Sequence, residues 1–145
     1  MRLVVNGDAV TTGAATTGGM TGDGTLLELV RMTAEVKRGC DDGTCGACRV
    51  LVDGCAVNSC IVQVSTLREG AKVETYEAIS AEAKVVLVIE AFERERPTRC
   101  RLCVGGLGVT AAALVRRPAS IDEAIGEAAC MCTGRGSWRR ALSVV

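Results

Sequence analysis

The chain of 145 residues contains no histidine, and only one tryptophan, one tyrosine and one phenylalanine. The absence of histidine excludes mixed Cys/His zinc sites, Rieske centres and catalysis by a histidine base. The shortage of aromatic side chains deprives the core of its largest apolar groups, so small folding units would be marginally stable alone. Bound metal centres would offset this, because metal-binding free energy is also folding free energy.

The sequence also lacks an excess of charge and long apolar runs. It has 17 basic and 17 acidic residues, which argues against a nucleic-acid-binding protein with a basic surface. No apolar run approaches the roughly 20 residues of a membrane span. The start MRLVVNGDAV reaches polar residues too early for a signal peptide. We therefore expect a cytoplasmic protein with no membrane and no nucleic-acid partner.

Cysteine, in contrast, is abundant, with nine residues in two groups. In a reducing compartment such a sequence is more typical of metal binding or redox chemistry than of structural disulfides. Five cysteines lie in the stretch CDDGTCGACRVLVDGCAVNSC, which runs from Cys40 to Cys60. The other four form a Cys-x2-Cys pair and a Cys-x-Cys pair in the second half of the chain: Cys100, Cys103, Cys130 and Cys132.

The first group has the spacing of a plant-type 2Fe–2S site, Cys-x4-Cys-x2-Cys with a distant fourth cysteine. The proposed ligands are Cys40, Cys45, Cys48 and Cys60. Cys55 is the rival for the fourth position. A zinc site is the alternative, but zinc usually takes two compact Cys-x2-4-Cys knuckles, which this spacing does not provide.

Three glycines lie beside these cysteines, at Gly39, Gly43 and Gly46. Glycine permits positive φ and close backbone approach, so N–H groups can point at the sulfurs. Such hydrogen bonds help to set the reduction potential of a cluster. We therefore predict that these glycines help to form the binding site.

The second group is ambiguous when it is considered alone. Its Cys-x2-Cys pair could be a thioredoxin-like redox motif, but no βαβ pattern surrounds it. Four thiolates could equally hold zinc or a second 2Fe–2S cluster. The glycines that follow, Gly105, Gly106 and Gly108, are interpreted as positions of close helix packing, because no strand precedes them. Trp138 is interpreted as an anchor for the last helix.

The hydrophobic pattern divides the chain near Ile79. Before it, short apolar runs at 3–5, 49–52, 56–57 and 72–76 predict strands, with Asn-Gly and Asp-Gly turns. Thr25 and Glu28 form a capping box that opens one helix. After it, helices are predicted at 80–96, with Ser80 as N-cap, at 107–117, from a second capping box at Ser120, and from 137 onward. We expect a small α+β domain over 1–78 and an all-helical domain over 79–145.

Together the two cysteine groups resemble the iron–sulfur subunit of the molybdenum hydroxylases, the xanthine dehydrogenase/aldehyde oxidase family. The resemblance spans essentially the whole chain, through VNG, LLELVR, KRGCDDGTCGACRVLVDG, AVNSC, the Cys-x2-Cys pair followed by a helix, and CMCTG. It implies a β-grasp ferredoxin-like domain followed by a four-helix bundle, with one 2Fe–2S cluster in each. The family's Ser-Cys ending selects Cys60 over Cys55, and the resemblance makes the second group a cluster site.

The resemblance further implies a subunit of an oxidoreductase that has no catalytic residue of its own. A large partner subunit would hold molybdopterin, possibly in the cytosine dinucleotide form, and a medium partner subunit would hold FAD. Electrons would pass from the pterin to the second cluster, then to the plant-type cluster, then to the flavin. In the family, the residues matching Cys132 and Arg99 lie against the pterin.

This sequence departs from the family pattern around the second group. The usual Gln-Cys-Gly-x-Cys-Thr-Pro-Gly is replaced by Arg-Cys-Arg-Leu-Cys-Val-Gly-Gly, starting at Arg99, and Met131 replaces the usual arginine between the last two ligands. We predict that Arg99 or Arg101 meets a phosphate or acidic group of the cofactor or partner. Two other functions stay open on the sequence: a free-standing ferredoxin-like carrier and a zinc-stabilised interaction module.

Overall fold

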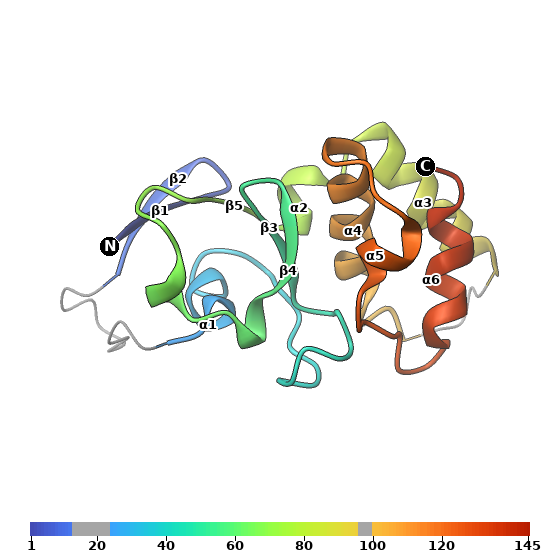
Figure 1. Ribbon diagram of the computed structural model, residues 1–145, viewed down its shortest axis with the longest axis horizontal. Coiled ribbons are helices and arrows are strands. Elements are labelled where there is room, and N and C mark those ends of the chain that lie inside the picture. Colours follow the sequence, from blue (N-terminus) through green and yellow to red (C-terminus); the bar gives the residue numbers. More distant parts are fainter. Residues whose placement is uncertain (13–23, 96–99) are drawn as a thin grey trace.

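The computed structural model describes residues 1–12, 24–95 and 100–145. A mixed sheet and one helix lie at one end of the long axis, and most of the helices lie at the other (Figure 1). The strands are β1 (Arg2–Val5), β2 (Asp8–Thr11), β3 (Arg49–Val52), β4 (Cys55–Asn58) and β5 (Lys72–Glu74). The helices are α1 (Leu26–Val30), α2 (Tyr76–Ile79), α3 (Ala83–Glu95), α4 (Val104–Arg116), α5 (Ile121–Ile125) and α6 (Gly134–Leu142), with 3-10 turns η1 (Ser59–Ile61) and η2 (Val64–Thr66).

The strand order in the sheet is β2-β1-β5-β3-β4. Strands β1 and β5 are parallel, and the other neighbouring pairs are antiparallel. Both predicted hairpins form, because Asn6 and Gly7, and likewise Asp53 and Gly54, adopt the positive φ that such tight turns require. The α+β class is therefore confirmed.

Strand β3 separates two hydrophobic cores. Val50 belongs to the core between the sheet and α1, whereas Leu51 belongs to the core formed by the helices of the second half. Neighbouring residues of a strand point to opposite faces, so β3 packs on both sides. Cys48 and Cys60 belong to the first of these cores, and Cys103 and Cys130 belong to the second. The division into domains at residues 78 and 79 stays a prediction.

Both predicted capping boxes are present, at Thr25 with Glu28 and at Ser120 with Glu123. The prediction of Ser80 as the N-cap of a long helix was wrong. Residues 76–79 form the separate short helix α2, Ser80 is its C-cap, and its hydroxyl donates to the Glu77 carbonyl at 3.2 Å. Strand β5 therefore ends at Glu74, two residues before the predicted end.

The remaining helices agree with the sequence pattern in type and differ in their ends. Helix α4 begins at Val104, three residues before its predicted start, and the Cys103 carbonyl accepts from the Leu107 N–H at 3.0 Å. Helix α6 likewise begins at Gly134, before Ser137. Within the described residues, no helix has the length and apolar character needed to span a bilayer. The predicted helix stop at Pro97 lies outside the described residues.

Candidate metal centres

The first cysteine group is built on one loop and one hairpin. The loop between α1 and β3 holds Cys40, Cys45 and Cys48, and Cys60 lies in η1, just after β4. The antiparallel register pairs Arg49 with Asn58. Since these two residues adjoin Cys48 and Ser59, the hairpin brings Cys48 and Cys60 to the same end of the sheet.

Backbone N–H groups point at the sulfurs of this group. The N–H of Cys45 donates to Cys40 Sγ at 3.3 Å, and that of Ala47 donates to Cys45 Sγ at 3.4 Å. The N–H of Cys60 donates to Cys48 Sγ at 3.4 Å. Such donors stabilise thiolate charge and suit metal-bound sulfur. Two of these contacts link candidate ligands directly, Cys45 to Cys40 and Cys60 to Cys48.

The three predicted glycines lie where a side chain would disturb this loop. Gly43 and Gly46 adopt positive φ, at 84° and 71°. A Cβ at Gly39 would lie 2.6 Å from Cys45 Sγ, closer than atoms can approach. The loop therefore requires glycine for backbone conformation at two positions and for space at the third.

The residues before Cys60 attach it to the loop. The Ser59 hydroxyl donates to the Cys48 carbonyl at 2.6 Å, and the Asn58 side-chain amide donates to the Gly43 carbonyl at 3.0 Å. Cys55 lies at the other end of β4, next to the hairpin turn. The structure therefore places Cys60, rather than Cys55, against Cys48.

The second cysteine group joins the start of α4 to the segment before α6. Sγ of Cys132 lies 3.6 Å from Sγ of Cys100 and 3.6 Å from Sγ of Cys130. Cys100 and Cys132 are exposed, whereas Cys103 and Cys130 are buried. The Thr133 N–H donates to Cys130 Sγ at 3.3 Å. Cys132 therefore lies close to thiols from both segments, Cys100 before α4 and Cys130 before α6.

Burial governs the acidity of the inner thiols. It raises the pKa of Cys103 to about 12, although a hydrogen bond from Trp138 opposes the increase. Burial also acts to raise the pKa of Cys130, but hydrogen bonds from Thr133 and Cys103 outweigh it, and the pKa falls to about 7. In the first group, burial is the main cause that raises the pKa of Cys60 to about 12. A metal must therefore displace protons from Cys60 and Cys103 at neutral pH.

The two groups are connected through the backbone. The Ala129 N–H donates to the Thr44 carbonyl at 2.8 Å, and these residues directly precede Cys130 and Cys45. Helix α4 touches the first loop at Gly106, where an added Cβ would lie 1.8 Å from the Gly46 carbonyl oxygen. The predicted close packing at this glycine is thus confirmed, and its partner is the first cysteine loop.

Sequence reasoning missed Arg49, and it gave Trp138 only the role of a helix anchor. Arg49 is 6% exposed at the start of β3, and its guanidinium lies 5.6 Å from the centroid of the Trp138 ring. Trp138 is fully buried, and its indole N–H donates to Cys103 Sγ at 3.5 Å. A charged residue directly after a ligand cysteine, in the otherwise apolar run RVLV, was the one available signal.

The structure describes only one of the two arginines for which a contact was predicted. Arg99 lies outside the described residues. Arg101 is exposed, forms an ion pair with Glu93, and lines a cavity of about 530 Å³ beside Cys100. The lining also includes Lys37, Glu77 and Tyr76. A cavity lined by both apolar and charged side chains therefore adjoins the exposed edge of the second cysteine group.

The donor set fits 2Fe–2S clusters. Every candidate ligand is a thiol, N–H groups point at several of the sulfurs, and a Cβ at Gly39 would fill space against Cys45. Among the described residues, no three cysteine or acidic side chains converge as a single metal ion requires. In a 2Fe–2S cluster each iron takes two of the four protein ligands, so no single iron requires three protein ligands.

Proteins of known function resemble this chain over most of its length, although no family model matches it. The xanthine dehydrogenase iron–sulfur-binding subunit of Escherichia coli O157:H7 is 33% identical over 118 residues, covering 75% of this chain and 74% of that protein. The nicotinate dehydrogenase small FeS subunit of Eubacterium barkeri is 33% identical and covers 75% of this chain and 74% of that protein.

Solved structures extend the similarity to the fold. Quinoline 2-oxidoreductase from Pseudomonas putida 86 aligns with 98% of this chain and 90% of its own matched chain, at 27% identity and a TM-score of 0.68. Aldehyde oxidoreductase from Desulfovibrio desulfuricans aligns with 99% of this chain and 17% of its own, at 26% identity and a TM-score of 0.70. The chain therefore belongs to the family of iron–sulfur subunits of the xanthine dehydrogenase-type molybdenum hydroxylases.

Proposed function

We propose that this chain binds two 2Fe–2S clusters and relays electrons from a molybdopterin site on a larger catalytic subunit to a flavin on another subunit. When bound, a 2Fe–2S cluster accepts and returns single electrons. The first group, Cys40, Cys45, Cys48 and Cys60, would hold one cluster. The second group, Cys100, Cys103, Cys130 and Cys132, would hold the other.

The observation that supports this proposal best is the close contact among the cysteines of each group. In the first group, the N–H of Cys45 donates to Cys40 Sγ, and that of Cys60 donates to Cys48 Sγ. In the second group, Cys132 Sγ lies 3.6 Å from Sγ of both Cys100 and Cys130, and Cys103 is hydrogen-bonded to Cys130. Four neighbouring thiols in each group match the four thiolates that hold a 2Fe–2S cluster.

The connection between the groups also suits a relay. From Cys130, the backbone reaches Cys45 through one hydrogen bond, from the Ala129 N–H to the Thr44 carbonyl. Electron transfer between two clusters requires that the clusters are held at a fixed separation. The close contact of Gly106 with Gly46 supplies that rigidity, because neither backbone can move toward the other.

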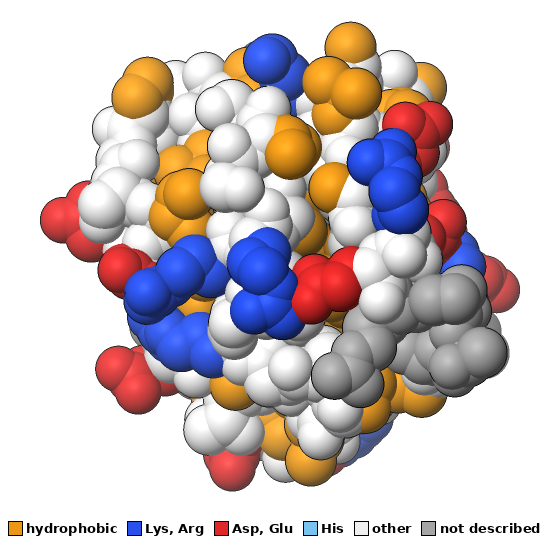
Figure 2. Space-filling view, turned by 90° about the vertical axis from the view of Figure 1, so that its right-hand side faces the viewer, with side chains coloured by type: hydrophobic (Ala, Val, Ile, Leu, Met, Phe, Trp, Pro, Cys, Tyr) orange, Lys and Arg blue, Asp and Glu red, His pale blue; other side chains and the backbone are white. Residues whose placement is uncertain are grey.

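We expect the catalytic subunit to bind at the exposed edge of the second group. Cys100 and Cys132 are exposed there, and Met131 between the last two ligands is 75% exposed. The helical end of the molecule carries intermixed basic, acidic and hydrophobic side chains (Figure 2). Its arginines include Arg139 and Arg140, which pair with Asp122 and Glu95. A mixed surface of this kind resembles a protein interface more than a nucleic-acid site.

The deciding experiment measures iron, zinc and acid-labile sulfide per chain in anaerobically purified protein. We expect about four irons and four sulfides, the content of two 2Fe–2S clusters. About two of each would leave one group empty and would favour the free-standing carrier. Zinc without sulfide would refute the electron-transfer proposal and would favour a zinc-stabilised module.

Arg99 and Arg101 remain candidates for contact with a phosphate or acidic group of the pterin cofactor or the catalytic subunit. Arg101 already lines the cavity beside Cys100, although Glu93 neutralises part of its charge. We expect Arg99→Gln to weaken subunit assembly or to reduce the cofactor content of the complex. Arg94→Gln, at the end of α3, is a control for the loss of one positive charge nearby. Unchanged assembly, cofactor content and turnover in Arg99→Gln would end this hypothesis for Arg99.

A further inference from the structure

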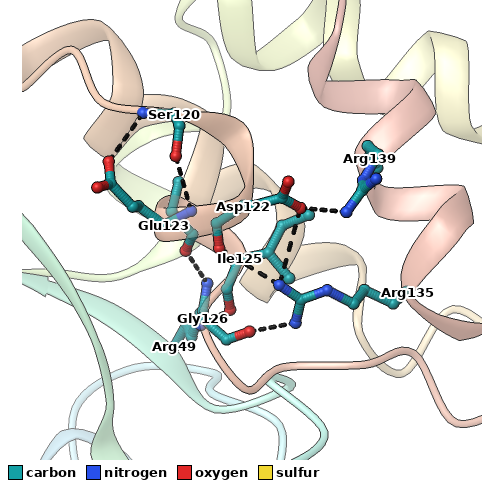
Figure 3. Close-up of polar contacts among 9 residues, drawn as sticks. Arg49, Ser120, Asp122, Glu123, Ile125, Gly126, Arg135 and Arg139 are labelled. Carbon is teal, nitrogen blue, oxygen red and sulfur yellow. Dashed lines mark hydrogen bonds and ion pairs between the residues drawn. The ribbon is translucent and has the colours of Figure 1, made fainter.

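A buried cation, Arg49, directly follows one of the proposed ligands of the first cysteine group. The Arg49 guanidinium donates to Asn58 Oδ1 at 3.0 Å, to Thr110 Oγ1 at 2.8 Å, and to the carbonyls of Ala124 at 2.8 Å and Ile125 at 2.5 Å. Figure 3 shows the guanidinium beneath the last turn of α5, with Arg135 approaching the same turn from α6. Arg49 therefore joins the sheet to α4 and α5.

All of these acceptors are uncharged, which is unusual for a buried arginine. Burial of a charge is costly unless an opposite charge compensates it. Burial is the main cause that lowers the pKa of Arg49 to about 10; the charge of Cys48 opposes the decrease, and the charge of Arg135 adds to it. Arg49 is therefore still a cation at neutral pH. The negative charge that acts on its pKa is that of Cys48, the cysteine that precedes it in the sequence.

The second element of this arrangement is Trp138. Its ring lies under the Arg49 guanidinium at 5.6 Å, a cation–π distance, and its N–H donates to Cys103 Sγ. The far edge of the same ring reaches the first loop, because a Cβ on Gly46 would lie 2.8 Å from it. One indole thus contacts a ligand of the second group and the loop of the first.

We propose that Arg49 and Trp138 form one buried unit that raises the reduction potentials of both clusters. A 2Fe–2S cluster held by four thiolates is anionic, and it gains one further negative charge when one electron enters; no bond breaks and no proton is needed. A cation beside Cys48 and an N–H donor on Cys103 stabilise the reduced forms more than the oxidised forms. This inference rests on the proposed function, since it requires clusters in both groups.

The alternative is a purely structural role, in which Arg49 and Trp138 only hold the sheet against the helices. The two roles differ in what they change. Loss of a structural contact lowers stability, whereas loss of the charge or the N–H lowers the potential of the neighbouring cluster. The potential is therefore the informative measurement.

The experiment is a redox titration of the cluster-loaded full chain, monitored by the EPR signals of the reduced clusters. Cys60→Ser and Cys100→Ser chains assign each signal to its group. In Trp138→Phe, which keeps an aromatic ring but removes the N–H, we expect the second cluster to become at least tenfold harder to reduce. That corresponds to a fall of about 59 mV for a one-electron couple. The first cluster should shift less.

Arg49 is tested by a matched pair. Arg49→Met removes the charge and keeps the apolar stem. Both clusters should then become about tenfold or more harder to reduce, and the potential of the first cluster should fall more. Arg49→Lys keeps the charge but loses most of the hydrogen bonds, and it should stay near the wild-type potentials. If stability alone mattered, the two variants would behave alike.

Val88→Ala controls for loosening of the core, because Val88 is fully buried in the same helical core. It should leave both potentials unchanged. Wild-type potentials in both Trp138→Phe and Arg49→Met would overturn the inference, as would an equal shift in Val88→Ala. If Trp138→Phe does not load its second cluster, the Arg49 pair decides. A wild-type chain that contains no second cluster by iron and sulfide analysis would refute the proposed function itself.

Discussion

Replacement of single glycines in α4 tests whether this helix lies as close to the first cysteine loop as the structure indicates. In a helix, Gly→Ala normally stabilises by about 1 kcal/mol, because alanine loses less conformational entropy. A Cβ at Gly106, however, would lie 1.8 Å from the Gly46 carbonyl oxygen and 2.9 Å from its carbonyl carbon. Both are backbone atoms of the loop between Cys45 and Cys48, so they cannot rotate away.

The helix or the loop must therefore move in Gly106→Ala. Overpacking of this kind costs about 1–3 kcal/mol and occasionally more. Since backbone has to shift, we expect the upper end of that range, and a net loss of about 2 kcal/mol after the helix gain. For a chain of this size, the apparent melting temperature should fall by roughly 6 °C. The displaced loop should also retain less iron.

Two neighbouring glycines provide matched controls within the same helix. A Cβ at Gly105 would meet Tyr76 Cβ at 3.5 Å, an ordinary contact, so Gly105→Ala should be neutral or stabilising by up to about 1 kcal/mol. A Cβ at Gly108 would lie 2.5 Å from the half-buried Tyr76 ring, which can move, so Gly108→Ala should be intermediate. Thermal unfolding at one fixed scan rate, with iron analysis, compares the three. A Gly106→Ala chain as stable as Gly105→Ala would refute the reasoning.

Two further predictions concern the first cysteine group and the second capping box. Cys60→Ser should lose the iron of the first cluster while Cys55→Ser keeps it, because Cys60 and not Cys55 lies against Cys48; iron and sulfide analysis of both variants checks this, and the opposite result would reassign the fourth ligand. Ser120→Ala should cost about 1 kcal/mol, since the hydroxyl accepts from the Glu123 N–H at 3.1 Å, and should lower the melting temperature by about 3 °C. Ser120→Thr, which keeps the hydroxyl, should melt close to wild type, and equal melting of the two variants would contradict a capping role.

The elements that sequence reasoning predicted well depend on neighbouring residues. The Asn-Gly and Asp-Gly turns and the two capping boxes each involve at most four consecutive residues, so their chemistry is visible in the sequence. The spacing of the first three cysteines is equally local. The error at Ser80 also comes from reasoning on neighbouring residues alone. Its hydroxyl suits an N-cap, but α2 forms just before it, because Ile79 is buried in the helical core.

The arrangement between the two cysteine groups was not predictable in this way. Arg49 bonds residues 61 and 75 positions away, at Thr110 and Ala124. No periodicity relates such positions, and a single arginine in a strand is compatible with many environments. Trp138 was interpreted as an anchor for the last helix, and it is buried, but its hydrogen bond to Cys103 depends on where α6 lies relative to the segment before α4. Pairings between distant segments appear only when the fold is known.

Trp138 also gives this protein a built-in optical probe. It is the only tryptophan in the chain, and it contacts a ligand of the second cysteine group. Its emission therefore reports from one place, between the two proposed clusters. Iron–sulfur clusters absorb light in the region of indole emission, so occupancy of the sites should quench the fluorescence. Chelation of the iron should restore it, and cluster loss could then be followed in real time without any label.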